Sequence, residues 1–169
     1  HAATLAYNVT GDEKLKKELD DMVVRLIATQ LPNGYLGTYD EAFRFMNVTN
    51  SADPKLLADD IEEDRKKAAS TASKQQRGGW DTWTFRYNIY GLLTYEKYFP
   101  NDEVIDACKK MADLLIQTYG TEKADLTHYG TRKGISATTL LESIVMLYER
   151  TLDQKYLDFA EEIVAMSEN

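Results

Sequence analysis

The stretch WDTWTFRYNIYGLLTYEKY, residues 80–98, decides the fold because its apolar and aromatic residues leave little room for a charged face. A helix on the surface of a protein normally has one apolar stripe and one charged face. Here tryptophan, tyrosine, phenylalanine, isoleucine and leucine occur on almost every side of the helical wheel. The sequence therefore predicts a buried helix over residues 81–98.

Three segments of the chain repeat one pattern, in which an apolar helix ending in tyrosine is followed by a short polar turn and an amphipathic helix. These segments span residues 5–30, 92–120 and 145–169. An aspartate stands at each expected start of the second helix, where its carboxylate accepts free backbone N–H groups as an N-cap. The three aspartates are Asp12, Asp102 and Asp153. The pattern predicts three αα-hairpins.

The two helices of each predicted hairpin differ in their apolar surface. The first helix is apolar nearly all round, whereas the second has one apolar face at helical spacing. Inner helices therefore alternate with outer ones, which is typical of an all-α toroid or solenoid. We expect a single domain over residues 1–169, interrupted by a charged insert at about 51–79 that has few large apolar residues.

Composition excludes several classes of partner. The chain has 169 residues and a formal charge of −8, so nucleic acid and anionic membranes would be repelled. No apolar run reaches the ~20 residues of a membrane span. The single cysteine, Cys108, cannot form a disulfide within the chain or a multi-cysteine metal site, and its spacing predicts a core position. We expect no metal or cofactor in this chain.

Candidate binding residues lie where the predicted inner helices begin. In αα-toroids the loops that lead to the inner helices open on one rim, so these residues converge around a central pit. Aromatic rings stack on the C–H faces of sugars, while polar groups bind the hydroxyls. The pattern predicts a carbohydrate cleft. Its candidate substrate-binding residues are Tyr35, Trp80, Trp83, Arg86, Tyr87 and His128.

Other interpretations of these residues remain open. Trp83 and Tyr87 are four residues apart, a spacing that also suits core packing. Asp81 is either an N-cap or a catalytic acid. Glu142, within an apolar helix, either faces a cavity or points to solvent. Asp81 and Glu142 are the candidate catalytic residues, and a sequence does not give the carboxylate separation that glycoside hydrolysis requires.

The blocks GYLGT at residues 34–38, WDTWT at 80–84 and YNIYGLL at 87–93, in this order, resemble a known family. They look like parts of the α/α-barrel catalytic domain of bacterial β-L-arabinofuranosidase-like glycoside hydrolases. The resemblance covers nearly the whole chain outside the charged insert. It implies about half of an (α/α)6 barrel, a parent protein that is a glycoside hydrolase, a carbohydrate substrate, and a secreted or periplasmic location.

The chemistry of that family adds further expectations. Its members use a cysteine nucleophile that is held on zinc with further cysteines and a glutamate, in a part of the domain that follows these blocks. The resemblance therefore implies that this chain carries part of the sugar-binding rim without the nucleophile and is inactive alone. Zinc is expected in the full-length parent. Because a half barrel leaves apolar inner-helix faces uncovered, we also expect a homodimer.

Two other functions fit the residues. One is a different sugar enzyme on the same toroid, such as an unsaturated-uronide hydrolase or an epimerase, which rely on acid pairs and on histidine pairs respectively. The other is a non-catalytic helical module that binds a protein or a glycan. The lack of a visible nucleophile favours the module, whereas the aromatic residues at the predicted rim favour a sugar enzyme.

Overall fold

The structure, a computed structural model, describes residues 1–41, 44–45, 80–120, 122–129 and 134–168. The regular secondary structure of these residues is helical, and the isolated bridge between Tyr119 and Ala124 belongs to no strand. The predicted all-α fold is therefore confirmed. The charged insert predicted at about 51–79 lies outside the described residues. In the part of the chain that is described, no helix is both long enough and apolar enough to cross a membrane.

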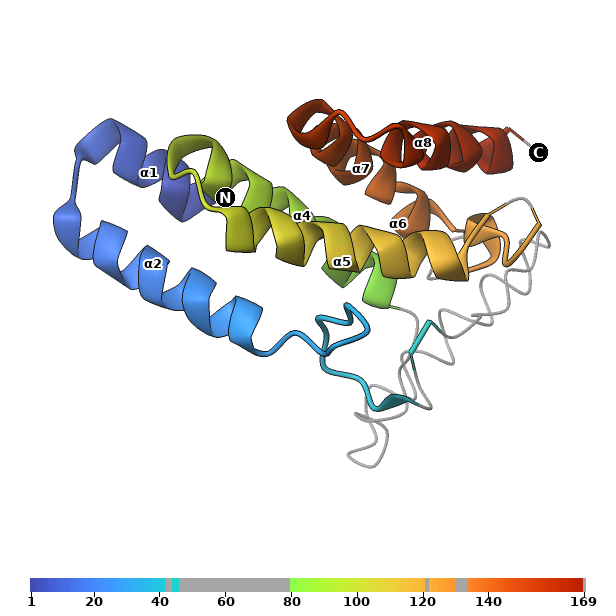
Figure 1. Cartoon of the computed structure of the whole chain (residues 1–169), viewed down its shortest axis with the longest axis horizontal. Coiled ribbons are helices and arrows are strands. Elements are labelled where there is room, and N and C mark those ends of the chain that lie inside the picture. Colours follow the sequence, from blue (N-terminus) through green and yellow to red (C-terminus); the bar gives the residue numbers. More distant parts are fainter. Residues whose placement is uncertain (42–43, 46–79, 121, 130–133, 169) are drawn as a thin grey trace, which may run out of the picture.

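Three helical hairpins form the framework (Figure 1). They are α1 (Ala2–Thr10) with α2 (Glu13–Ala28), α4 (Asp81–Tyr98) with α5 (Asp102–Thr118), and α7 (Leu140–Thr151) with α8 (Gln154–Ser167). The two helices of each hairpin pack on each other. Two short helices, η3 (Leu126–His128) and α6 (Ile135–Thr138), lie between α5 and α7 in the chain. The helix predicted over residues 81–98 has the bounds of α4, and the three hairpins are confirmed.

Two of the three predicted N-caps are confirmed. Asp12 accepts two backbone N–H groups from the first turn of α2, and Asp153 accepts one from the first turn of α8. The prediction for Asp102 is wrong, because Asn101 caps α5 instead and accepts two N–H groups at 2.9 and 3.3 Å. Asn101 has the extended backbone that an N-cap requires, whereas Asp102 is the first residue of the helix.

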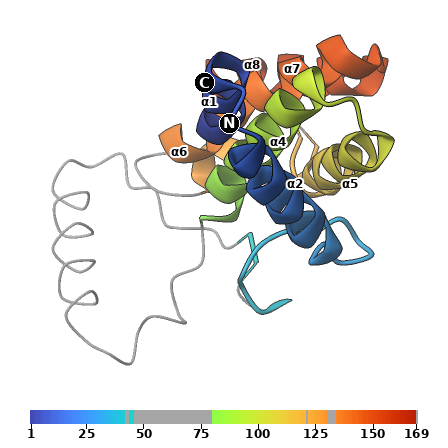
Figure 2. The same cartoon turned by 90° about the vertical axis from the view of Figure 1, so that its left-hand side faces the viewer.

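The helices are arranged in two layers around α4. Helix α4 packs against α1, α5 and α7, and Figure 2, which looks nearly along the helices, shows it in the middle of them. Helices α1, α4 and α7 form the inner layer, while α2, α5 and α8 cover them from outside. This alternation confirms the predicted partial α/α toroid, with three of its hairpins in the described residues.

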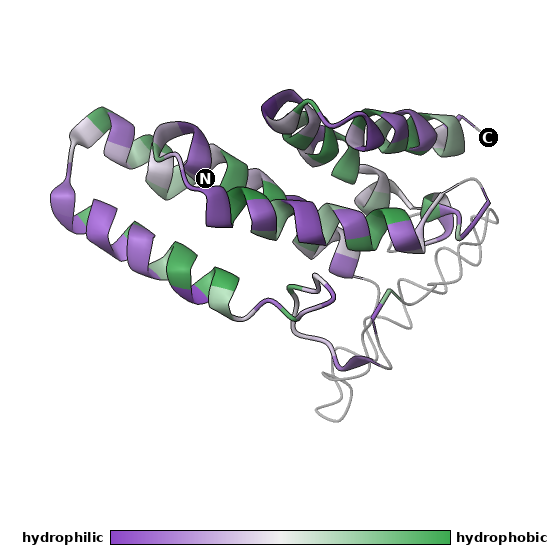
Figure 3. Cartoon of the chain, in the orientation of Figure 1, coloured by the Kyte–Doolittle hydropathy of each residue, from purple (hydrophilic) through white to green (hydrophobic). Residues whose placement is uncertain are grey.

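The core runs between the two layers. Figure 3 shows hydrophobic and hydrophilic residues alternating along α2 and α5, as expected for outer helices with one buried face. Cys108 of α5 is fully buried, which confirms its predicted core position. The prediction that α4 is buried holds for nine of its eighteen residues and is wrong for others, because Tyr87 is 49% exposed and Tyr98, the last residue of the helix, is 36% exposed. The largest fully buried side chains include Tyr35, Phe85, Ile89, Met111, Leu115, Tyr119, Leu140, Ile144, Tyr156 and Phe159.

Candidate functional site

Three aromatic residues at the beginning of α4, namely Trp80, Trp83 and Tyr87, form what we call the aromatic cluster. The rings of Trp80 and Trp83 meet edge to face with their centroids 6.2 Å apart, and those of Trp83 and Tyr87 do so at 5.3 Å. Spacings of three and four residues place them on one side of the helix. Trp80 is 39% exposed and Tyr87 is 49% exposed. Two of the three rings are therefore partly exposed to solvent, and Tyr87 is not a core residue.

Arg86 lies beside this cluster and forms an ion pair with Glu142 of α7. Its guanidinium carbon is 4.8 Å from the ring centroid of Tyr87 and 5.6 Å from that of Trp83. Its Nη2 donates a hydrogen bond of 2.8 Å to Oε2 of Glu142. This bond raises the pKa of Arg86, so the guanidinium keeps its charge. We call the two residues the Arg86–Glu142 pair.

Helix packing explains how residues so far apart in the sequence meet here. Helices α4 and α7 lie side by side in the inner layer. The hydroxyl of Ser143, which is buried next to Glu142, donates a 2.9 Å hydrogen bond to the backbone carbonyl of Arg86. This bond fixes the first turns of α7 against α4. Glu142 is therefore half exposed to solvent and also pairs with Arg86. Of the two interpretations that the sequence left open for Glu142, the structure agrees with the one in which it points to solvent.

Asp81 belongs to a separate, internal arrangement. It is only 2% exposed, and its Oδ1 accepts a 2.5 Å hydrogen bond from the hydroxyl of Tyr35. Its Oδ2 accepts one of 2.9 Å from the backbone N–H of Phe45. Burial raises the pKa of Asp81, and the hydrogen bond from Tyr35 opposes that shift. We call these three residues the Asp81 clasp. Asp81 is neither the N-cap of α4, a position taken by Trp80, nor an acid on an open surface.

Tyr35 does not lie on the open surface with the aromatic cluster, which corrects its expected contact with a ligand. Its ring is 1% exposed and packs against Phe85 with centroids 5.6 Å apart. The guanidinium of Arg44 lies 4.0 Å from the centroid of the same ring. The tyrosine hydroxyl also accepts the backbone N–H of Tyr39 at 3.3 Å. Tyr35 therefore ties Tyr39 and Arg44, which follow it closely in the chain, to the beginning of α4.

His128 lies on the short helix η3 and is not a member of the aromatic cluster. It is the last residue of η3, which packs against α6, and α6 in turn packs against α4. Its side chain is exposed. The ring contacts found among the described residues do not connect His128 to Trp80, Trp83 or Tyr87. The structure thus brings four of the six predicted binding residues together and leaves Tyr35 and His128 outside the group.

The described residues do not fit a zinc site of the kind that the resemblance implies. Among them, no three His, Cys, Asp or Glu side chains are grouped closely enough to hold a metal ion. Cys108 is fully buried, and its pKa is raised first by that burial and then by the nearby carboxylate of Glu96. A thiol in this state is a poor ligand and a poor nucleophile.

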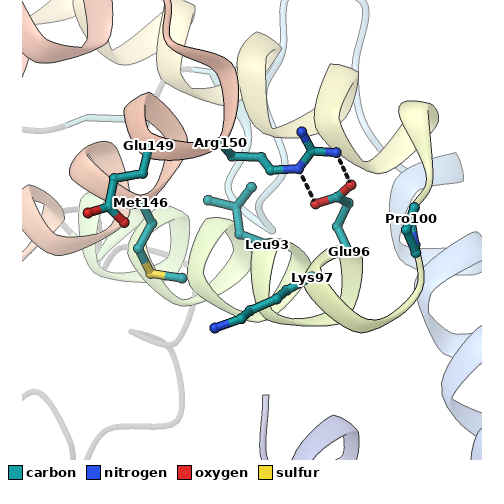
Figure 4. A pocket seen from close by; sticks show the side chains of 7 residues that line it. All are labelled: Leu93, Glu96, Lys97, Pro100, Met146, Glu149 and Arg150. Atoms are coloured by element: carbon teal, nitrogen blue, oxygen red, sulfur yellow. Dashed lines mark hydrogen bonds and ion pairs between the residues drawn. The ribbon is translucent and has the colours of Figure 1, made fainter.

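A hollow of about 380 Å³ lies where α4 and α7 end, away from the aromatic cluster (Figure 4). Its walls carry a bidentate ion pair, in which Nε and Nη2 of Arg150 donate to the two oxygens of Glu96 at 2.7 and 2.6 Å. Sequence reasoning missed this pair, although an acid within the apolar part of α4 was a signal that a cation must face it. The lining residues are Leu93, Glu96, Lys97, Pro100, Met146, Glu149 and Arg150.

Comparison with known protein families defines the class of this protein. Residues 1–168 match the family described as β-L-arabinofuranosidase, GH127 catalytic domain. The chain belongs to this family of glycoside hydrolase catalytic domains. The resemblance read from the sequence is thereby confirmed, while a bacterial origin stays a prediction. Searches among curated proteins and among solved structures found no match.

Proposed function

We propose that the aromatic cluster and the Arg86–Glu142 pair form part of the sugar-binding rim of a glycoside hydrolase that acts on arabinofuranoside-type sugars. The observation that supports this most is their position together on one exposed face. The rings offer a surface for sugar C–H groups, Arg86 offers hydrogen-bond donors, and Glu142 offers an acceptor. Glu142 is available for this role because its side chain is 51% exposed.

Family membership supports the rest of the proposal. The match to a β-L-arabinofuranosidase catalytic domain favours hydrolysis of a glycosidic bond by the parent protein. We place this chain on the substrate side of that reaction and assign it no nucleophile, because its one cysteine is buried. Zinc in the full-length parent, inactivity of the chain alone, a homodimer and a secreted or periplasmic location stay predictions.

Intrinsic fluorescence tests the binding surface directly. The chain has two tryptophans, and both belong to the aromatic cluster, so a change in tryptophan emission reports on this surface. Titration with a methyl L-arabinofuranoside should change the emission in a saturable way. Replacing Tyr87 by alanine should weaken binding about tenfold, since aromatic contacts often dominate the affinity of a small interface.

Tyr98→Ala is the matched control for Tyr87→Ala. Tyr98 is also an exposed tyrosine of α4, at 36% exposure, but it lies at the other end of the helix. It should bind the sugar like the wild type. Trp83→Ala separates binding from packing when thermal unfolding is measured in parallel. A large loss of stability with unchanged affinity, measured by calorimetry, would assign Trp83 to the core and remove it from the proposed rim.

A further inference from the structure

The charge balance of the proposed rim has a consequence for selectivity. An arginine that stacks beside aromatic rings is a ready partner for a carboxylate, because its donors match two oxygens at once. In this structure Glu142 is the carboxylate that pairs with Arg86, and its Oε2 accepts one hydrogen bond of 2.8 Å from Nη2. The side chain of Arg86 is 21% exposed and that of Glu142 is 51% exposed. The acid is therefore the more accessible member of the pair.

We propose that Glu142 is a specificity-determining residue, which makes this surface select neutral sugars over sugars that carry a carboxylate. The inference rests on the proposed function, since it requires that the aromatic cluster binds sugar. A neutral sugar can donate its hydroxyls to the exposed Glu142 carboxylate. A uronate would bring a second negative charge next to Glu142, and like charges in contact oppose binding.

The pair is not needed merely to join the two helices. Ser143 already ties α7 to α4 through its hydrogen bond to the carbonyl of Arg86. A half-exposed ion pair contributes little to stability, because water screens it and two long side chains must be ordered. The Arg86–Glu142 pair lies beside the rings of Trp83 and Tyr87. This position connects the pair to the selection of a sugar ligand.

The test compares two sugars on two variants that lose the same charge from the same helix. Methyl L-arabinofuranoside is the neutral probe and galacturonate is the acidic probe, with tryptophan emission as the signal at low ionic strength. Glu142→Gln removes the acid of the pair, and Glu149→Gln removes an exposed acid of α7 that lines the hollow at the other end. Glu142→Ala is a second variant if the glutamine form does not fold.

We expect Glu142→Gln to raise the affinity for galacturonate about tenfold, because repulsion ends and Arg86 becomes available. The affinity for the arabinofuranoside should change less. Glu149→Gln should leave both affinities unchanged. Adding Arg86→Gln to Glu142→Gln should abolish the gain for galacturonate. In the wild type, 1 M salt should reduce the preference for the arabinofuranoside over galacturonate, because the Debye length then falls to about 3 Å and charge repulsion is screened.

The outcomes separate this inference from the proposed function. If the wild type binds the neutral sugar but Glu142→Gln gains no more for galacturonate than Glu149→Gln does, Glu142 does not determine selectivity, and the sugar-binding rim stands. If the wild type binds galacturonate as tightly as the arabinofuranoside, the inference is also overturned. If neither sugar changes the tryptophan emission of any variant, the proposed binding surface fails, and the inference fails with it.

Discussion

Two arginine–glutamate pairs join α4 to α7, one near each end, and they are built in opposite ways. Near the start of the helices, Arg86 of α4 is 21% exposed and its partner Glu142 is 51% exposed. Near their ends, Glu96 of α4 is 2% exposed and its partner Arg150 is 51% exposed. Helix α4 thus supplies the less exposed member of each pair, a cation near one end and an anion near the other.

This difference indicates which pair stabilises the fold and which pair is exposed enough to contact a ligand. A buried carboxylate needs a partner, because an unpaired charge away from water is very unfavourable. Glu96 meets that need with a bidentate bond to Arg150, and this pair belongs to the framework. Arg86 has aromatic rings on its flank, and its acid faces water. Helix α7 also places Glu142 in its first turn and Arg150 in its last, as the helix dipole favours.

Breaking the Glu96–Arg150 pair should have the largest effect. Arg150→Met keeps much of the side-chain bulk but leaves the Glu96 carboxylate buried without its cation. We expect the midpoint of thermal unfolding to fall by on the order of 10 °C, measured by circular dichroism. The double variant Glu96→Met/Arg150→Met should recover most of the loss, since it removes the buried charge as well. A double variant no more stable than Arg150→Met would show that packing, not charge, explains the loss.

The sequence predicted the helices well because their signals are local. Aromatic and aliphatic residues run to Tyr98, and Pro100 cannot continue a helix, so the bounds of α4 follow from the sequence. The N-cap of α5 was misassigned because Asn101 and Asp102 are both good caps, and the backbone angle that decides between them is not written in the residues.

The site was harder to predict because it depends on which helices meet. The first turns of α4 and its N-cap supply four of these residues, and helical spacing alone predicts that they lie close together. They are Trp80, Trp83, Arg86 and Tyr87. The approach of Glu142 to Arg86 needs the packing of α7 on α4. Tyr35 has the residue type of a sugar ligand, but the backbone around it turns its hydroxyl inward to Asp81. The residue type therefore indicated that Tyr35 carries a polar group, but not that this group points into the protein.

The Asp81 clasp extends the comparison to a buried carboxylate that is held by neutral donors. Tyr35→Phe removes the hydroxyl that donates to Asp81, and we expect a loss of about 2 kcal/mol in the free energy of unfolding. Urea denaturation measures it. Tyr95→Phe is the matched control, because the Tyr95 hydroxyl donates at 2.7 Å to Asp20, whose side chain is 39% exposed. Its loss should be smaller. Equal losses would mean that burial of the acceptor does not matter.

The pH dependence of stability gives a smaller effect from the same clasp. Because burial raises the pKa of Asp81, the folded state binds this proton more tightly than the unfolded state does. Protonation of Asp81 therefore favours folding as pH falls, and this contribution is lost as pH rises through the raised pKa. Asp81→Asn cannot ionise. The melting temperature of the wild type minus that of the variant should decrease by a few degrees between about pH 4 and pH 7.

A variant at an exposed acid provides the control for that measurement. Asp21 lies on α2 and is exposed. Asp21→Asn should therefore give a melting-temperature difference from the wild type that stays flat over the same range of pH. If the Asp81→Asn difference is also flat, or increases with pH, then the hydrogen bonds from Tyr35 and Phe45 outweigh the burial of the charge, and the direction argued for Asp81 is wrong.

The smallest effect on stability should come from the exposed acid of the other pair. Glu142→Gln leaves Arg86 against the rings of Trp83 and Tyr87, so we expect the free energy of unfolding to change by no more than about 0.5 kcal/mol. Urea denaturation at low salt measures this change. A loss of unfolding free energy as large as that of Arg150→Met would mean that both ion pairs stabilise the fold. A near-zero loss together with altered sugar preference would instead establish that one helix pair carries a structural ion pair at one end and a selective one at the other.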